Sequence, residues 1–442
     1  MALTGRAALL AALGSLVVLL APRPGYALLG VCLLLAALIV IDLLAAGGVR
    51  TLRFRRDGER LVRLGGTASA ALVVENPGPR RVRAVIRDAW PPSARPSPRT
   101  HRVDLPPGGR RRLVTTLAPV RRGDREAVAV TVRSFGPLGL AARQGTHRVP
   151  WTVRVLPPFH SRRHLPSRLA RLRELEGGHP VLVRGQGTEF DSLREYVIGD
   201  DVRSIDWRAT ARRADVVVRT WRPERDRRVL IVLDTARTSA GRVGVIPEGV
   251  PEAPSGWPRL DWSMDAALLL AALAARAGDR VDFLAYDRAV RAWVTGVSRT
   301  ELLSTLVNVM APLEPELVEP DSEGMAAAVL ARASRRCLVV LLTDLNGAAL
   351  EEGLLPVLPR LSSRHLVLVA AVTDPRVAAM AADRRDAEAV YDAAAAERLL
   401  AERRAVTARL RRLGVEVVDA LPEDIAPALA DAYLALKAAG RL

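Results

Sequence analysis

The chain has 442 residues, 49% of them hydrophobic and few aromatic, which is enough for two or three domains with aliphatic cores. Its net charge of +17 comes almost entirely from arginine, because Lys437 is the only lysine. The arginines alternate with acids instead of forming a basic run, so we expect no nucleic-acid partner. Cys32 and Cys337 lie far apart without Cys/His metal spacing, which argues against disulfides and zinc and fits a reducing compartment.

Two apolar runs open the chain, residues 5–21 and 26–46, each close to the length that crosses a bilayer. A cleaved signal peptide is the alternative for the first run, but a second run so soon after it favours a transmembrane hairpin over residues 1–48. Six arginines lie between Arg50 and Arg63, whereas the hairpin loop has only Arg23. The positive-inside rule therefore predicts a multi-pass plasma-membrane protein with its N-terminus and bulk in the cytoplasm.

Residues 49–156 show short alternating runs separated by proline- and glycine-rich turns, which predict an antiparallel β-sandwich. The expected strands are 68–74, 82–86, 112–117, 127–132 and 152–156. No catalytic constellation lies here, so we interpret the domain as a spacer or interaction module. Residues 157–184 are predicted to be a linker with a helix over 166–175, ended by Gly177-Gly178.

A stretch dense in alternating charges and interleaved aromatics, residues 185–227, follows as a charged collar. Asp200 or Asp201 is expected to cap a short helix whose apolar positions are Val202, Ile205 and Ala209, and residues 214–221 are expected to form a strand. Two interpretations stay open for the collar charges: an ion-paired belt that fixes a loop, or a surface for a partner. The candidate collar residues are Glu189, Phe190, Arg194, Tyr196, Asp200, Asp201, Arg203, Asp206, Trp207 and Arg212.

Strands and helices alternate from residue 228 to 442, which predicts an α/β domain with a doubly wound, mostly parallel sheet. The continuous apolar run 229–232 ends in Asp234, as expected for a buried strand that delivers a carboxylate to the sheet edge. The other expected strands are 281–286 and 289–294 as a hairpin, 337–343, 365–372 and 415–419, and the expected helices are 260–277, 299–310, 322–333, 348–361, 385–413 and 423–438.

The collar carries a family resemblance. Its pattern resembles the signature G-x-E-F-x-x-L-R-x-Y-x-x-G-D-D-x-R-x-I-D-W-x-x-x-A-R of the bacterial family called domain of unknown function 58, which precedes a von Willebrand factor A-like domain. The segments 121–123 and 135–140 also resemble the family's membrane-proximal region. The resemblance implies a MoxR-type AAA ATPase as partner and a role as an adaptor in protein assembly, activation or remodelling near the membrane, with the client protein unknown.

Domains of the von Willebrand factor A type often carry a metal-ion-dependent adhesion site, in which a D-x-S-x-S loop, a threonine and a later aspartate bind Mg²⁺. Here Asp234 and Thr238 match the ends of the loop and Asp344 matches the later aspartate, so these three are the candidate metal residues. Ala236 stands where a hydroxyl is expected, and Ser322 is the nearest counterpart of the threonine. The alternative is that Asp234 caps a loop and pairs with an arginine. Arg237 could then supply the positive charge of the cation.

Enzyme motifs are absent from the sequence: it has no G-x-S-x-G elbow, no H-E-x-x-H and no P-loop lysine. We therefore expect a non-enzymatic, membrane-anchored cytoplasmic adaptor with Mg²⁺ as the only candidate cofactor. A structural envelope protein without an ATPase partner is one alternative. A hydrolase that uses collar acids such as Asp200 and Asp201 is another.

Overall fold

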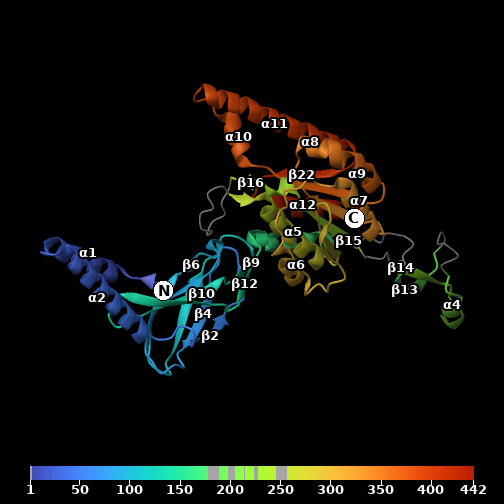
Figure 1. The fold of residues 1–442 in the computed structure, drawn as a ribbon. Helices are drawn as coiled ribbons and strands as arrows, with labels where there is room; N and C mark the ends of the chain where they lie inside the picture. The colour runs from blue at the N-terminus through green and yellow to red at the C-terminus, as the bar shows by residue number, and fades with distance from the viewer. Residues whose placement is uncertain (1, 178–188, 198–204, 214, 223–226, 245–255) are drawn as a thin grey trace. The chain divides into compact units, whose positions relative to one another are not determined.

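A computed structural model describes residues 2–177, 189–197, 205–213, 215–222, 227–244 and 256–442 (Figure 1). The described residues form two compact units that divide after Pro157. The first contains antiparallel sheets and two apolar helices, and the second combines a mostly parallel sheet with helices. The expected mixed α/β composition is confirmed.

Two antiparallel sheets pack around a shared aliphatic core in the first unit. One has the order β1-β11-β10-β5-β7 and the other β2-β4-β8-β6, while β3, β12 and β9 form a separate small sheet. Alternation places Leu72, Ile86 and Val132 fully inside. The strands are β1 (Ala2–Leu3), β2 (Arg53–Gly58), β3 (Leu61–Arg63), β4 (Ala68–Glu75), β5 (Val82–Ala89), β6 (Pro96–Ser97), β7 (Thr100–Leu105), β8 (Arg110–Leu117), β9 (Gly123–Glu126), β10 (Ala129–Phe135), β11 (Ala141–His147) and β12 (Thr152–Leu156).

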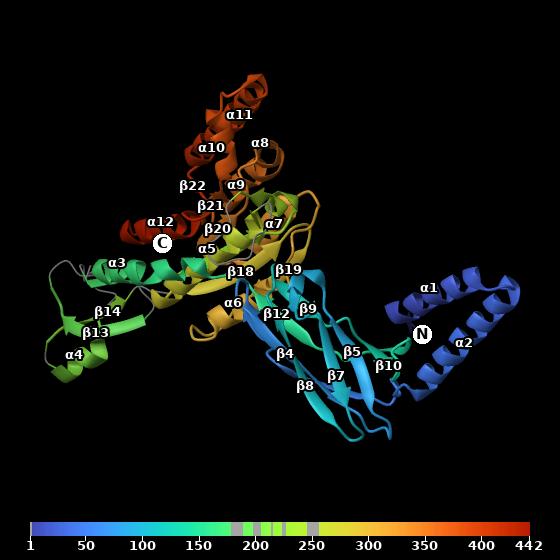
Figure 2. The same cartoon turned by 90° about the vertical axis from the view of Figure 1, so that its left-hand side faces the viewer.

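The apolar runs form helices α1 (Gly5–Leu20) and α2 (Pro24–Ala45), which lie side by side (Figure 2). Of the described helices, α2 alone is long and apolar enough to cross a membrane. With 16 residues, α1 would span about 24 Å at 1.5 Å per residue, less than the ~30 Å hydrocarbon core. The structure therefore supports one candidate span near the N-terminus, and the second predicted span is not established.

Both ends of this helical pair attach to the same part of the sandwich. The strand β1, ahead of α1, pairs with Ala141 and Ala142 of β11, and the Thr4 hydroxyl donates a 2.6 Å hydrogen bond to the Gly139 carbonyl. At the end of α2, the fully buried Asp42 carboxylate accepts hydrogen bonds from the backbone N–H groups of Leu138, Leu140 and Ala141. The start of α1 and the end of α2 are thus held at one loop.

A six-stranded sheet organises the second unit, in the order β19-β18-β15-β20-β21-β22. All neighbours are parallel except β19, which returns as a hairpin from β18 as predicted. The apolar run of β15 is buried on both faces, which explains its lack of alternation. The sheet strands are β15 (Arg228–Asp234), β18 (Arg280–Tyr286), β19 (Val290–Val294), β20 (Leu338–Leu342), β21 (Leu366–Val372) and β22 (Glu416–Ala420).

Helices cover both faces of this sheet. On one face, α5 contacts β15, β18 and β21, and α12 contacts β21 and β22. On the other, a single core joins the sheet to α7, α9 and α11. The principal helices are α3 (Leu165–Gly177), α5 (Arg259–Arg276), α6 (Leu302–Met310), α7 (Ser322–Arg332), α8 (Gly347–Ala349), the π-helical turn η5 (Leu350–Leu354), α9 (Leu355–Ser362), α10 (Pro375–Ala382), α11 (Ala387–Arg412) and α12 (Ile425–Ala438).

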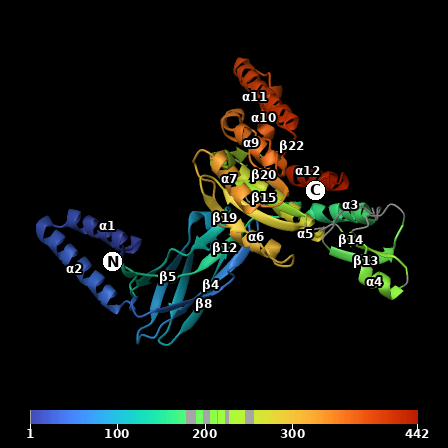
Figure 3. The ribbon, with the colours of Figure 1, turned by 90° about the vertical axis from the view of Figure 1, so that its right-hand side faces the viewer.

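Several elements differ from the prediction, and the strands β2, β7 and β11 were not predicted. The expected helix 348–361 is divided by η5 and contains Pro359, which cannot donate a backbone hydrogen bond. The helix α10 was not predicted and lies beside α11 (Figure 3). The segment predicted as linker 157–184 contains α3, whose Leu172 is buried and whose Arg168 pairs with Asp431 of α12 at 2.9 Å, so this helix packs as part of the second unit.

Candidate functional site

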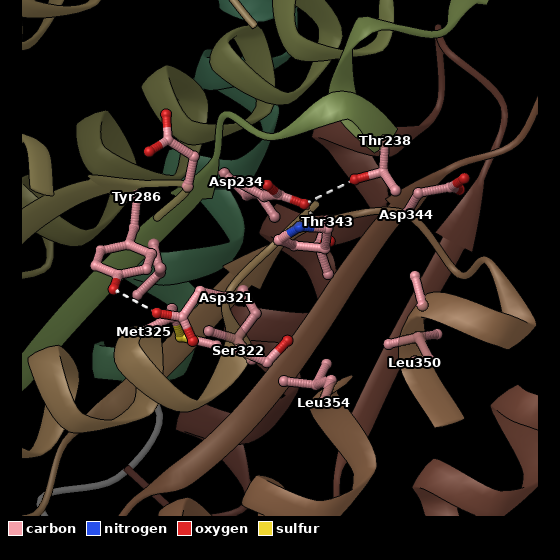
Figure 4. Close-up of a pocket in the computed structure, with 16 residues that line it drawn as sticks. Asp234, Thr238, Tyr286, Asp321, Ser322, Met325, Thr343, Asp344, Leu350 and Leu354 are labelled. Atoms are coloured by element: carbon pink, nitrogen blue, oxygen red, sulfur yellow. Dashed lines mark hydrogen bonds between the residues drawn. The ribbon is translucent and has the colours of Figure 1, made fainter. Parts of the chain in front are cut away.

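The carboxyl edge of the parallel sheet gathers the predicted loop residues around Asp234, the last residue of β15. Its Oδ1 accepts a 2.8 Å hydrogen bond from the Ala236 backbone N–H, and its Oδ2 accepts from the hydroxyls of Thr238 at 2.9 Å and Thr343 at 2.7 Å. Asp234 and Thr238 therefore lie together as predicted (Figure 4). Thr343 was not among the predicted site residues, although it directly precedes Asp344 after the end of β20.

Burial governs the charge of Asp234. Removal from water raises the pKa of its carboxyl group, and the nearby Asp344 carboxylate raises it further. The three hydrogen bonds from Ala236, Thr238 and Thr343 lower the pKa but do not offset the burial. The ionised form of the Asp234 carboxyl group is therefore destabilised by burial, and a positive group beside it would stabilise that form.

Asp344 has its positive partners already. Its Oδ2 lies 3.2 Å from Nη1 of Arg259 at the start of α5, and its Oδ1 lies 2.9 Å from Nη1 of Arg403 on α11. Arg403 also binds both oxygens of Asp419 on β22. Burial alone would lower the pKa of Arg403, but its bonds to Asp419 and Asp344 outweigh it and raise the pKa above the usual value. The four side chains form a charge-balanced group that is partly buried, with Asp419 at its exposed end.

The predicted role of Arg237 is wrong. Its guanidinium lies 2.7 Å from Glu319 and is largely exposed, so it neutralises a surface carboxylate instead of standing in for a cation at Asp234. The arginines at this edge are Arg259 and Arg403, which only the fold brings to Asp344. Asp234 itself accepts hydrogen bonds from neutral groups, and the alternative in which it pairs with an arginine has no support among the described residues.

An open pocket of about 530 Å³ lies beside these residues (Figure 4). Its polar wall includes Asp234, Thr343 and Asp321, the residue that caps α7 and accepts a 3.3 Å hydrogen bond from the Tyr286 hydroxyl. Its apolar wall includes Leu350 and Leu354 of the π-helical turn, a kind of turn that often occurs at functional sites. Pockets at the carboxyl edge of such sheets are the usual ligand sites of α/β folds.

The donor set fits Mg²⁺ poorly. The ion prefers about six oxygen ligands in an octahedron. Ala236 offers no side-chain oxygen, both carboxylate oxygens of Asp344 are paired with arginines, and Ser322 lines the pocket without a recorded bond to Asp234. Within the described ranges, no group of three or more His, Cys, Asp or Glu could hold a metal ion. Asp234, Thr238 and Thr343 would have to supply the protein ligands.

The charged collar is described in part. An antiparallel ribbon joins β13 (Glu189–Glu195) to β14 (Val217–Arg222), and the Tyr196 backbone N–H donates to the Val216 carbonyl. The helix α4 (Trp207–Arg213) follows Asp206, whose carboxylate caps it by accepting from the N–H groups of Arg208 and Ala209. The predicted helix start is therefore wrong: Asp206 is the cap, and Ile205 lies before the helix in an isolated β-bridge with Val218.

The structure describes the side chains of only some of the other predicted collar residues. Trp207 is 68% exposed and Arg212 is exposed. Asp200, Asp201 and Arg203 lie outside the described residues, as do the side chains of Glu189, Phe190 and Arg194. The choice between an ion-paired belt and a partner surface thus stays a prediction.

A family model described as "Protein of unknown function DUF58" matches residues 192–413, half of the chain. The chain belongs to this family. The match runs from the collar ribbon through the sheet to α11, so it contains Asp234, Thr343, Asp344 and both arginines of the site. The resemblance inferred from the collar signature is confirmed.

Curated relatives of this DUF58 chain have no stated activity. The uncharacterized protein Rv1480 of Mycobacterium tuberculosis is 27% identical over 204 residues, which cover 46% of this chain and 60% of the relative. The uncharacterized protein YeaD of Bacillus subtilis is 24% identical over 124 residues, 28% of this chain and 31% of the relative. The chain thus matches less than two thirds of the length of these relatives.

Among solved structures, the chain is similar to the CARDB domain of a Pyrococcus furiosus protein, solved with di-metal ions. The two share 16% sequence identity, with a TM-score of 0.18 and coverage of 24% of this chain and 86% of that domain. A likeness this weak carries no argument about function.

Proposed function

We propose that this DUF58 protein is a membrane-anchored cytoplasmic adaptor that binds other proteins, has no enzymatic activity of its own, and works with a MoxR-type AAA ATPase. The observation that carries the binding role is the open pocket at the carboxyl edge of the sheet, lined by Asp234, Thr238, Thr343 and Asp321. The ATPase partner rests on the family resemblance.

We infer a von Willebrand factor A-like, doubly wound fold for the second unit. The strand order β19-β18-β15-β20-β21-β22, with helices on both faces, supports this inference. In such a fold the first central strand delivers the loop that binds partners, and β15 delivers Asp234 at that place. The charged network of Arg259, Arg403, Asp344 and Asp419 supports a binding role over a catalytic one, because it ties these groups to one another.

For the anchor, we propose that α1 and α2 both enter the membrane, with the N-terminus and the two units in the cytoplasm. The attachment of β1 and of Asp42 to the loop 138–141 supports this arrangement, because it requires both ends of the hairpin to lie on one side. The excess of arginine after Gly48 supports a cytoplasmic position for that side.

The test is affinity capture of the tagged full chain from native membranes, with Mg²⁺ and again with chelator, followed by mass spectrometry. We expect an AAA ATPase of the MoxR type in the captured material, at levels well above those of a tagged protein that carries only residues 1–48. Its absence under both conditions would contradict the ATPase partnership and favour a structural envelope role. Recovery that depends on Mg²⁺ would support a working metal site despite Ala236.

A further inference from the structure

The carboxylates of the edge pocket differ in whether a positive charge already faces them. Among the residues that the structure describes, the lining contains four aspartates and no Lys, Arg or His. Asp344 is paired with Arg259 and Arg403, and Asp287 lies 3.5 Å from the guanidinium of Arg291. These two carboxylates have their counter-charges within the protein.

Asp234 and Asp321 differ from them, because the groups that reach these two carboxylates are neutral. Asp234 accepts from a backbone N–H and two threonine hydroxyls. Asp321 accepts from the Gly324 N–H at 2.8 Å and the Tyr286 hydroxyl at 3.3 Å. No ion pair to either is found in the part of the chain that the structure describes. Two carboxylates therefore line one cavity with only neutral hydrogen-bond donors beside them. A cation bound between them would balance their negative charge.

Another part of the lining is hydrocarbon. Leu350 and Leu354 of the π-helical turn line the pocket, and Met325 of α7 lies beside Asp321 (Figure 4). Leu341 of β20 also lines the pocket. A hydrated metal ion would gain nothing from such a wall. An aliphatic chain of three or four methylenes would be stabilised by it, because contact with this wall removes the apolar surface of the methylenes from water.

We propose that this pocket is a metal-independent receptor for a lysine or arginine side chain of a partner protein, with the ammonium or guanidinium group between Asp234 and Asp321 and the stem against Leu350, Leu354 and Met325. The proposal rests on the proposed protein-binding function and names the chemistry of its ligand. The poor fit to Mg²⁺ supports it: Ala236 lacks an oxygen, and Asp344 is held by two arginines.

The direct test uses four small probes on the full chain in lipid nanodiscs, with binding measured by saturation-transfer NMR. The probes are the N-acetyl methylamides of lysine, arginine, norleucine and glutamate. Norleucine keeps the aliphatic stem of lysine and lacks the ammonium group, so it separates charge from apolar contact. Each titration is run with EDTA and again with excess MgCl₂.

We expect lysine and arginine probes to bind equally with EDTA and with MgCl₂, norleucine to bind more weakly, and glutamate not to bind. Asp234→Asn and Asp321→Asn should each weaken the lysine probe by about tenfold, as the loss of one charge-assisted hydrogen bond implies. Asp383→Asn is the matched control, because Asp383 lies outside the pocket and pairs with Arg385. Glutamate binding that requires MgCl₂ would overturn the proposal in favour of a metal site, and binding of no probe would also overturn it.

Affinity capture with the same variants separates this inference from the adaptor function. If wild-type protein recovers an ATPase or client and Asp234→Asn and Asp321→Asn recover equal amounts, the adaptor stands and the pocket proposal fails. If wild-type protein recovers no partner but binds the lysine probe through Asp234 and Asp321, the pocket proposal stands and the ATPase partnership fails.

Discussion

Among single residues, Asp265 is the carboxylate whose burial has the clearest consequence for stability. It lies on α5, is 4% exposed, and accepts hydrogen bonds from the Ser161 backbone N–H. Burial raises its pKa from 3.8 to about 6, against the lowering effect of the bonds from Ser161. Since the folded state binds the proton more tightly, this residue favours folding most below about pH 4. That contribution is lost as pH rises through about 6.

We therefore predict that Asp265→Asn stabilises the protein at pH 7.5. A shift of about 2 pKa units corresponds to ~3 kcal/mol, and the gain should shrink to near zero at pH 4. Thermal unfolding of the full chain in detergent at several pH values measures it. Asp383→Asn is the control with the opposite sign, because Arg385 lowers the pKa of Asp383 to about 2. A gain of equal size at pH 4 and pH 7.5 would contradict the ionisation argument.

The residues of the edge site show what a sequence can predict at this scale. Asp234, Thr238 and Asp344 follow or end apolar runs, so their meeting at one sheet edge could be inferred from strand periodicity. Arg259 and Arg403 could not, because one begins a helix and the other lies within a 26-residue helix, and their approach to Asp344 depends on how both helices pack on the sheet.

Among the helices and strands, those with a clear sequence pattern were predicted and those that depend on packing were not. Continuous apolar runs in β15, β20 and β21 are buried on both faces, and each was predicted within about two residues of its bounds. By contrast, β11 contains Arg143, Gln144 and Gly145 with few β-branched residues, so it carries no strand signal of its own and depends on pairing with β10. The short helix α10 did have a signal, since Asp374 caps it and Pro375 begins it.

The ion pairs that connect α11 to the ends of β20 and β22 lead to a prediction about the stability of the second unit. Arg403 is 13% exposed at its side chain and holds Asp344 and Asp419 together. Arg403→Met keeps much of the side-chain volume but leaves two carboxylates without their shared partner, and should destabilise the second unit by about 3 kcal/mol. Chemical denaturation of the full chain measures this loss.

The control variant lies on the same helix. Arg398 forms an exposed pair with Glu402, so Arg398→Met should cost less than about 1 kcal/mol. Equal losses for Arg398→Met and Arg403→Met would show that the Asp344–Arg403–Asp419 network is not what holds α11 to the sheet edge.

For the whole molecule, the attachment of the helical pair to the sandwich limits how the two helices can be arranged in a membrane. Because β1 pairs with β11 and Asp42 binds the loop 138–141, the start of α1 and the end of α2 must lie on the same side of the membrane. If both helices enter the bilayer, as we propose, the exposed Arg23 between them faces the opposite side from Arg50. If the pair lies along the membrane surface, Arg23 and Arg50 lie on the same side.

Cysteine labelling in intact cells distinguishes these topologies. We expect Arg23→Cys to react with a membrane-impermeant maleimide from outside, and Arg50→Cys to react only after permeabilisation. Cys337 is buried with its thiol pKa raised to about 11, and the exposed Cys32 of α2 is replaced by alanine in the labelled variants. Asp42→Ala is a second probe: it leaves the N–H groups of Leu138, Leu140 and Ala141 without acceptors, so proteolysis between α2 and the sandwich should become faster. If Arg23→Cys reacted only after permeabilisation, the hairpin would lie along the membrane surface. The low charge of the loop around Arg23 would then be explained by contact with lipid and not by transfer of the loop across the membrane.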